Sequence, residues 1–108
     1  MSGVLIELRR GGLYLSCEVY ERFFAGLETV VLLRRKSDLV VLPVRHPAAG
    51  GYLLKRRNGV GDRVVFAPDF FREHGISDDA DCKLEADWDA EQVALIASEC
   101  FASTHFAY

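Results

Sequence analysis

The sequence lacks most of the features that mark disulfide-bonded, metal-binding or membrane proteins. It has only 3 cysteines, far apart and without a CxxC pair, so neither a disulfide framework nor a zinc site is expected. Charged residues interrupt every apolar run well before the roughly 18 residues that a membrane-spanning helix needs. The amino terminus has no long apolar stretch of the secretory type. We therefore expect a cytoplasmic protein that does not enter a membrane.

Catalytic motifs are missing as well. The chain has no GxSxG, HExxH or GxGxxG motif and no phosphate-binding loop. Its three histidines, His46, His74 and His105, lie far apart and share no ligand spacing. The acidic residues 78–81 lack the glycine and the spacing of a calcium loop. We expect no enzymatic activity, no metal and no cofactor.

Apolar residues make up 50% of the 108-residue chain, and the charges are unevenly distributed. This apolar content excludes intrinsic disorder, and the length suits one small domain. Residues 1–63 hold 11 Lys and Arg against 6 Asp and Glu, whereas residues 64–108 hold 2 against 10. The two halves can attract each other, or the basic half can meet a polyanion such as nucleic acid. The net charge of −3 lacks the overall basicity typical of nucleic-acid binders.

The first half of the chain is expected to form strands around one short helix. Apolar and β-branched runs predict four strands, at residues 4–8, 13–15, 29–33 and 39–44. The paired glycines of Arg9–Gly12 predict a turn. Ser16 can cap a helix over Cys17–Phe24, and Gly26 can end it. Residues 34–38 are expected to form a hairpin turn.

The second half is expected to follow the same order after a linker of small residues at 46–51. Four strands are predicted, at residues 52–55, 62–66, 81–86 and 92–97. Pro68 suits the first position of a helix that ends at His74 and Gly75. Asp87–Glu91 is expected to be a hairpin turn, in which Trp88 either anchors a partner or folds back onto the domain. Residues 98–108 show no period and form a tail.

The similar order of the two halves predicts an internal repeat. At an offset of 51 residues, LYLSCEVYERFF aligns with VVFAPDFFREHG, and Arg9-Arg10 matches Arg56-Arg57 at an offset of 47. We expect a single domain over residues 1–108, with repeats at 3–45 and 51–97. One unit cannot bury its apolar face alone, so the two would interleave into a closed β-barrel about a pseudo-twofold axis. The alternative is chance similarity between two short amphipathic helices.

The second repeat, GDRVVFAPDFFREHGISDDADCKLEA, resembles the swapped-hairpin barrel of AbrB-like transition-state regulators and MazE-type antitoxins. The residues that match their pattern are Gly61, Arg63, Val64, Val65, Phe66, Pro68, Arg72, Gly75, Ile76 and Asp81. Asp62 intrudes between the glycine and the arginine. In the first repeat, Gly11-Gly12 replaces Gly-Arg and Cys17 replaces the proline. Two such units in one chain are similar to the tandem arrangement of the MraZ family, although the first repeat lacks that family's acidic-to-arginine signature.

The resemblance covers about residues 4–96 and implies both a fold and a function. The fold is α+β and mainly β, a pseudo-symmetric barrel of two ββαββ repeats. Such proteins bind duplex DNA through the basic loop between the first two strands of a unit and through neighbouring arginines. Carried over residue by residue, this implies DNA contacts by Arg9, Arg10, Arg56, Arg57 and Arg63. The expected protein is a small cytoplasmic transcriptional regulator or antitoxin-like protein that acts as a homo-oligomer.

A second interpretation is a non-enzymatic interaction or assembly module that uses its acidic half and its tail. Residues 99–108 contain Phe101, Phe106 and Tyr108, which could form a docking arm for a protein partner. The same segment could instead be a terminal strand or a disordered end.

Overall fold

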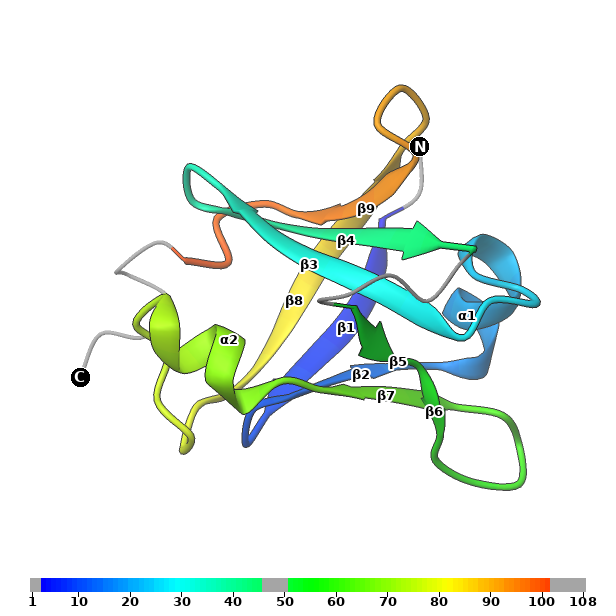
Figure 1. Cartoon of the computed structure of the whole chain (residues 1–108), viewed down its shortest axis with the longest axis horizontal. Coiled ribbons are helices and arrows are strands. Elements are labelled where there is room, and N and C mark those ends of the chain that lie inside the picture. Colours follow the sequence, from blue (N-terminus) through cyan, green and yellow to red (C-terminus); the bar gives the residue numbers. More distant parts are fainter. Residues whose placement is uncertain (1–2, 46–50, 102–108) are drawn as a thin grey trace.

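The structure is a computed structural model, and it describes residues 3–45 and 51–101. Within these ranges, nine strands and two short helices form one mainly antiparallel domain, whose sheet curls into a nearly closed barrel (Figure 1). Residues 46–50 of the predicted linker and residues 102–108 of the predicted tail lie outside the described residues. Neither helix of the described chain is long and apolar enough to cross a membrane.

The first half has the predicted order of elements. They are β1 (Val4–Arg9), β2 (Gly12–Leu15), α1 (Cys17–Phe23), β3 (Thr29–Arg35) and β4 (Asp38–Val44). The Ser16 side chain caps α1 by accepting a hydrogen bond from the Val19 N–H at 3.2 Å. The predicted turn at residues 34–38 is shorter than expected, because Arg35 pairs with Asp38 and extends both strands.

The second half is more interrupted. Its elements are β5 (Tyr52–Leu53), β6 (Lys55–Arg56), β7 (Arg63–Phe66), α2 (Pro68–Glu73), β8 (Asp81–Asp89) and β9 (Ala94–Ala97). The predicted strand at 52–55 is divided at Leu54, whose side chain is buried and whose N–H donates to the Glu28 carbonyl at 2.8 Å. Pro68 begins α2 as predicted.

The predicted hairpin turn at Asp87–Glu91 is wrong. β8 continues through Asp89, and the turn occupies residues 90–93. The reason is burial, because Trp88 alternates with the buried Ala86 and packs inward. Its ring stacks on Phe23 with centroids 4.9 Å apart, so Trp88 folds back onto the domain. This contact outweighs the turn preference of the aspartates on either side.

The sheet has the strand order β5-β3-β4-β9-β8-β1-β2-β7-β6. Its two outermost strands, β5 and β6, are neighbours in the chain and are separated only by Leu54. The segment Tyr52–Arg56 therefore pairs with β3 through its first part and with β7 through its last part, which nearly closes the sheet. A sheet closed in this way leaves few unpaired edges.

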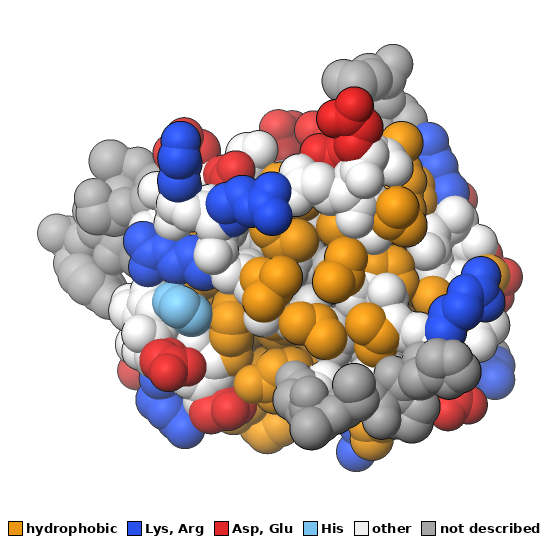
Figure 2. Space-filling view, turned by 45° about the horizontal axis from the view of Figure 1, so that its top comes forward, with side chains coloured by type: hydrophobic (Ala, Val, Ile, Leu, Met, Phe, Trp, Pro, Cys, Tyr) orange, Lys and Arg blue, Asp and Glu red, His pale blue; other side chains and the backbone are white. Residues whose placement is uncertain are grey.

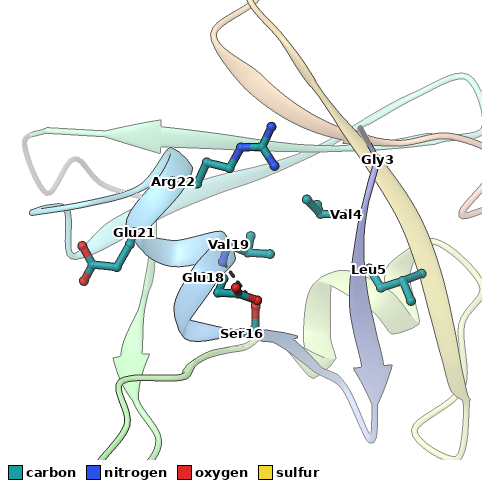
Figure 3. A pocket seen from close by; sticks show the side chains of 8 residues that line it. All are labelled: Gly3, Val4, Leu5, Ser16, Glu18, Val19, Glu21 and Arg22. Carbon is teal, nitrogen blue, oxygen red and sulfur yellow. Dashed lines mark hydrogen bonds between the residues drawn. The ribbon is translucent and has the colours of Figure 1, made fainter. Parts of the chain in front are cut away.

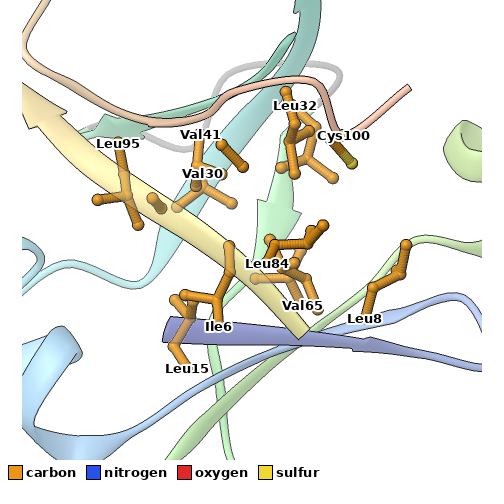
Figure 4. Close-up of a cluster of buried hydrophobic side chains, with 14 of the residues drawn as sticks. Ile6, Leu8, Leu15, Val30, Leu32, Val41, Val65, Leu84, Leu95 and Cys100 are labelled. Atoms are coloured by element: carbon orange, nitrogen blue, oxygen red, sulfur yellow. The ribbon is translucent and has the colours of Figure 1, made fainter. Parts of the chain in front are cut away.

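The core fills the inside of the barrel with side chains from both halves. The largest fully buried side chains include Phe24, Phe71, Ile6, Leu13 and Leu95. Figure 4 shows leucine, isoleucine and valine side chains of several strands gathered in one cluster. Close packing of this kind requires residues from both halves, so neither half has a complete core of its own.

The start of the predicted tail belongs to this packed region. Phe101 is buried, its N–H donates to the Ser37 carbonyl at 2.9 Å, and its ring lies 6.1 Å from that of Phe70. Phe101 is therefore not exposed for docking a partner. Phe106 and Tyr108 of the predicted docking arm lie outside the described residues.

Candidate nucleic-acid interface

A row of five side chains crosses the outer face of the sheet at Tyr14. The register pairs Tyr14 with Glu7 and Val64, Val64 with Lys55, and Glu7 with Lys83. Directly paired residues share a face, and Leu13 and Leu15 on either side of Tyr14 point into the core. The row therefore faces solvent and carries a lysine at each end.

Two of the predicted arginines meet at the Tyr14 ring. The guanidinium carbon of Arg9 lies 4.5 Å from the ring centroid and that of Arg57 lies 4.9 Å from it. These distances are within the range of cation–π attraction. Arg9 is the last residue of β1 and Arg57 lies in the loop after β6, so pairing of β2 with β1 and β7 brings the two arginines to one ring. We call Arg9, Tyr14, Lys55, Arg57 and Lys83 the Tyr14 cluster.

Arg9 forms only a weak ion pair within the protein. Its Nη2 lies 3.7 Å from Glu7 Oε1, and the two side chains are 36% and 39% exposed. Its Nε is buried and has no hydrogen-bond partner among the described residues. A weak, half-exposed ion pair of this kind leaves the outer guanidinium nitrogens able to exchange Glu7 for another anion.

The other three predicted arginines point elsewhere. Arg56 folds onto its own loop, with Nε 3.1 Å from the Asn58 carbonyl oxygen and Nη2 3.2 Å from that of Gly59. Arg63 lies 3.8 Å from the ring centroid of Tyr20 on α1 and donates to the Gly61 carbonyl. Arg10 is exposed at the tip of the first turn. The five arginines therefore do not form one surface.

Asp62, which intrudes into the expected Gly-Arg pattern, fixes the second loop. Its Oδ1 accepts the Cys17 N–H at 2.7 Å and its Oδ2 accepts the Asn58 side-chain amide at 2.9 Å. These hydrogen bonds, from Asn58 first and then from Cys17, lower the pKa of the Asp62 carboxyl below its usual value. The Arg57 N–H also donates to the Asp62 carbonyl at 2.8 Å. Asp62 thus joins the loop that carries Arg57 to the start of α1.

Three members of the Tyr14 cluster do not belong to the sequence-predicted site. No sequence motif marks Tyr14, Lys55 or Lys83 as part of a site. Alternation indicates the outward direction of Tyr14 and Lys83, because each lies between apolar neighbours in its strand. The strand order places Lys55 and Lys83 in one row with Tyr14, and alternation alone does not predict that order.

The electrostatic character of this face is mixed. A depression of about 280 Å³ lies beside Tyr14, and its lining includes Arg57 and Lys83 together with Glu7 and Asp62. On the face seen in Figure 2, the Lys and Arg side chains also lie in separate groups around a central hydrophobic area. On the face seen in Figure 2, the positive charge therefore forms local patches rather than a continuous strip.

Two of the three cysteines are held as protonated thiols by burial. Burial raises the pKa of the Cys82 thiol, and it raises the pKa of the Cys100 thiol to about 12, so both are protonated at neutral pH. In the acidic segment, Asp78 forms a 2.9 Å ion pair with Arg72. The described residues contain no group of three or more His, Cys, Asp or Glu side chains placed to hold a metal ion.

Comparison of the chain with models of protein families, with curated proteins and with solved structures gives no match.

Proposed function

We propose that this protein is a small DNA-binding regulator or antitoxin-like protein that contacts duplex DNA through the Tyr14 cluster. The observation that carries the proposal is the meeting of Arg9 and Arg57, 48 residues apart in the chain, at one solvent-facing aromatic ring. Cations gathered at one surface position can neutralise phosphates and release their counterions. Arg10, Arg56 and Arg63 would contribute to the surrounding field without sharing this contact.

The strand pairing supports a swapped-hairpin arrangement of two repeats. In this comparison β5 and β6 together, the two parts of Tyr52–Arg56, take the place of β1. Exchanging the halves then converts the β1–β2 pair into β6–β7, the β3–β4 pair into β8–β9, and the β1–β8 pair into β5–β3. The β2–β7 and β4–β9 pairs then map onto themselves. We infer that the segments 3–45 and 51–97 are repeats of one ββαββ unit, as the resemblance to AbrB-like proteins implies.

DNA binding can be tested by fluorescence anisotropy with a labelled duplex of random sequence at about 50 and 200 mM salt. We expect Arg9→Ala combined with Arg57→Ala to lower the affinity at least about tenfold, and to make the slope of log K against log salt less negative by about 2. The matched control is Arg34→Ala combined with Arg35→Ala, which removes the same charge from the β3–β4 hairpin. Absence of salt-dependent binding, or an equal loss in the control, would contradict the proposal.

Self-association of the proposed regulator is supported by an apolar outer face on β3, β4, β5 and β9. Val31 pairs with Leu42, and Leu33 pairs with Val40, which in turn pairs with Ile96. Figure 2 shows hydrophobic side chains gathered over these strands. Leu33 is 42% exposed, and contiguous apolar patches of this kind commonly mark contact surfaces. We propose that a second copy of the chain packs here, so that the regulator acts as a homo-oligomer.

Sedimentation equilibrium tests this assembly. We expect Leu33→Glu to raise the dissociation constant of the oligomer at least about tenfold, because a charge would be buried in an apolar contact. The control Val60→Glu adds the same charge at a 71% exposed residue of the second loop and should leave it unchanged. A wild-type chain that is monomeric at about 100 µM would rule out this contact.

The proposed setting is the cytoplasm. All three cysteines of the chain are free thiols, and a reducing compartment maintains that state.

A further inference from the structure

β1 has an unpaired edge next to α1. β8 pairs with β1 along the whole of Val4–Arg9, whereas β2 pairs only with Glu7–Arg9 because the chain leaves β2 at Leu15 to enter α1. Within the described part of the chain, Val4–Ile6 therefore has a strand partner on one side only. Such an edge presents backbone N–H and C=O groups that can pair with another strand.

Leu5 carries the backbone groups that face this edge. The turn at Arg10 and Gly11, with φ of 50° and 77°, is of type I′, in which the flanking residues bond to each other. Arg9 therefore directs its N–H and C=O toward β2, and every second residue before it, back to Leu5, does the same. In agreement, the Arg10 N–H is directed to the other side and donates to the Ala80 carbonyl at 3.2 Å.

A hollow of about 800 Å³ lies beside this edge. Its lining includes Gly3, Val4 and Leu5 from the start of the chain and Glu18, Val19 and Arg22 from α1. Figure 3 shows β1 on one side and α1 on the other, with Val4 and Val19 between them. The hollow thus combines unpaired backbone groups with apolar side chains, the two features that strand-adding peptide sites use.

The charge around the hollow is mainly negative. Both Glu18 and Glu21 are exposed on α1, but only the Glu18 carboxylate lies on the side of α1 that faces β1 (Figure 3). Asp87 approaches the end of the hollow, since a Cβ at Gly3 would lie 3.3 Å from its Oδ1. The cation in the lining is Arg22, whose guanidinium carbon lies 5.0 Å from the Phe23 ring centroid. A bound segment would therefore gain from carrying positive charge.

We propose that this hollow binds an extended segment of a partner protein, which adds to the Val4–Ile6 edge of β1 as a further strand. The segment carries an apolar side chain toward Val4 and Val19 and a basic side chain toward Glu18. The proposal does not depend on DNA binding, because none of the five predicted DNA-contacting arginines lines the hollow.

The probe is a labelled, acetylated peptide of about ten residues that alternates valine and lysine, with a valine–glutamate peptide as its control. We expect saturable binding of the lysine peptide by fluorescence anisotropy. Leu5→Pro, which removes the edge N–H, should lower the affinity at least about tenfold relative to Leu5→Ala, which removes the same side chain and keeps the N–H. Glu18→Lys should lower it by a similar factor, whereas Glu73→Lys on α2 should change it less than about twofold.

Four results would overturn the proposal. The first three are no saturable binding at about 1 mM peptide, equal affinities of Leu5→Pro and Leu5→Ala, and equal affinities for the two peptides. The fourth is that Leu5→Pro dissociates an oligomer of the chain without changing peptide affinity, because a second copy would then occupy the edge. If Leu5→Pro does not fold, the hydrogen-exchange rate of the Leu5 backbone amide in the wild-type chain is the alternative measurement. Saturation with the lysine peptide should slow this exchange at least about tenfold, and no slowing would overturn the proposal.

Discussion

Gly11→Ala is expected to lower the free energy of unfolding by about 2–4 kcal/mol. Gly11 has a φ of 77°, a conformation that alanine adopts only with strain. A Cβ at this position would also lie 2.6 Å from the Pro68 Cβ and 2.7 Å from the Pro68 Cα. The first turn and the start of α2 are further joined by the Ala67 N–H, which donates to the Gly11 carbonyl at 2.9 Å. Urea unfolding followed by the fluorescence of Trp88, the only tryptophan, measures the loss.

Gly26→Ala is the matched control for this prediction. Gly26 has nearly the same φ, 79°, but a Cβ there would meet nothing within 4 Å. Its replacement should cost only the conformational strain, about 1 kcal/mol. The difference between the two variants therefore isolates the contact with Pro68. Equal losses would show that the close approach of the first turn to α2 is not present in solution.

Phe24→Ala is expected to lower the free energy of unfolding by about 3–5 kcal/mol. Phe24 is 0% exposed, and its ring meets that of Trp88 edge-on with centroids 6.3 Å apart. Removing it leaves a cavity between α1 and β8. A loss of this size is a large fraction of the roughly 5–15 kcal/mol that stabilises a domain of this length. Urea unfolding followed by circular dichroism avoids the direct effect of the substitution on Trp88 fluorescence.

The control for this cavity is Phe66→Ala. Phe66 lies on β7 with 62% of its surface exposed, so the same change should cost less than about 1 kcal/mol. If both substitutions destabilise the protein equally, then Phe24 does not occupy the buried position described here.

Local signals were sufficient for the first half of the fold. Ser16 predicted the start of α1, and the paired glycines predicted the turn between β1 and β2, because caps and tight turns depend on residues that are adjacent in the chain. The prediction was wrong at Asp87–Glu91, where polar residues typical of turns surround Trp88. The inward packing of Trp88 on Phe23 is a contact between residues 65 positions apart, and no local pattern shows it.

The sequence likewise predicts only part of the candidate site. The basic character of Arg9 and Arg57 and the outward direction of Tyr14 follow from residue type and strand alternation. Their meeting at one ring requires β2 to lie between β1 and β7, which is set by how the two halves bury their apolar faces together. The hollow beside β1 likewise exists because β2 does not extend along the first three residues of β1, where the chain instead enters α1. Composition and periodicity thus define the strands and helices and their buried faces. Long-range strand pairing decides which charged side chains and which strand edges become neighbours, because such pairing joins residues that are distant in the chain.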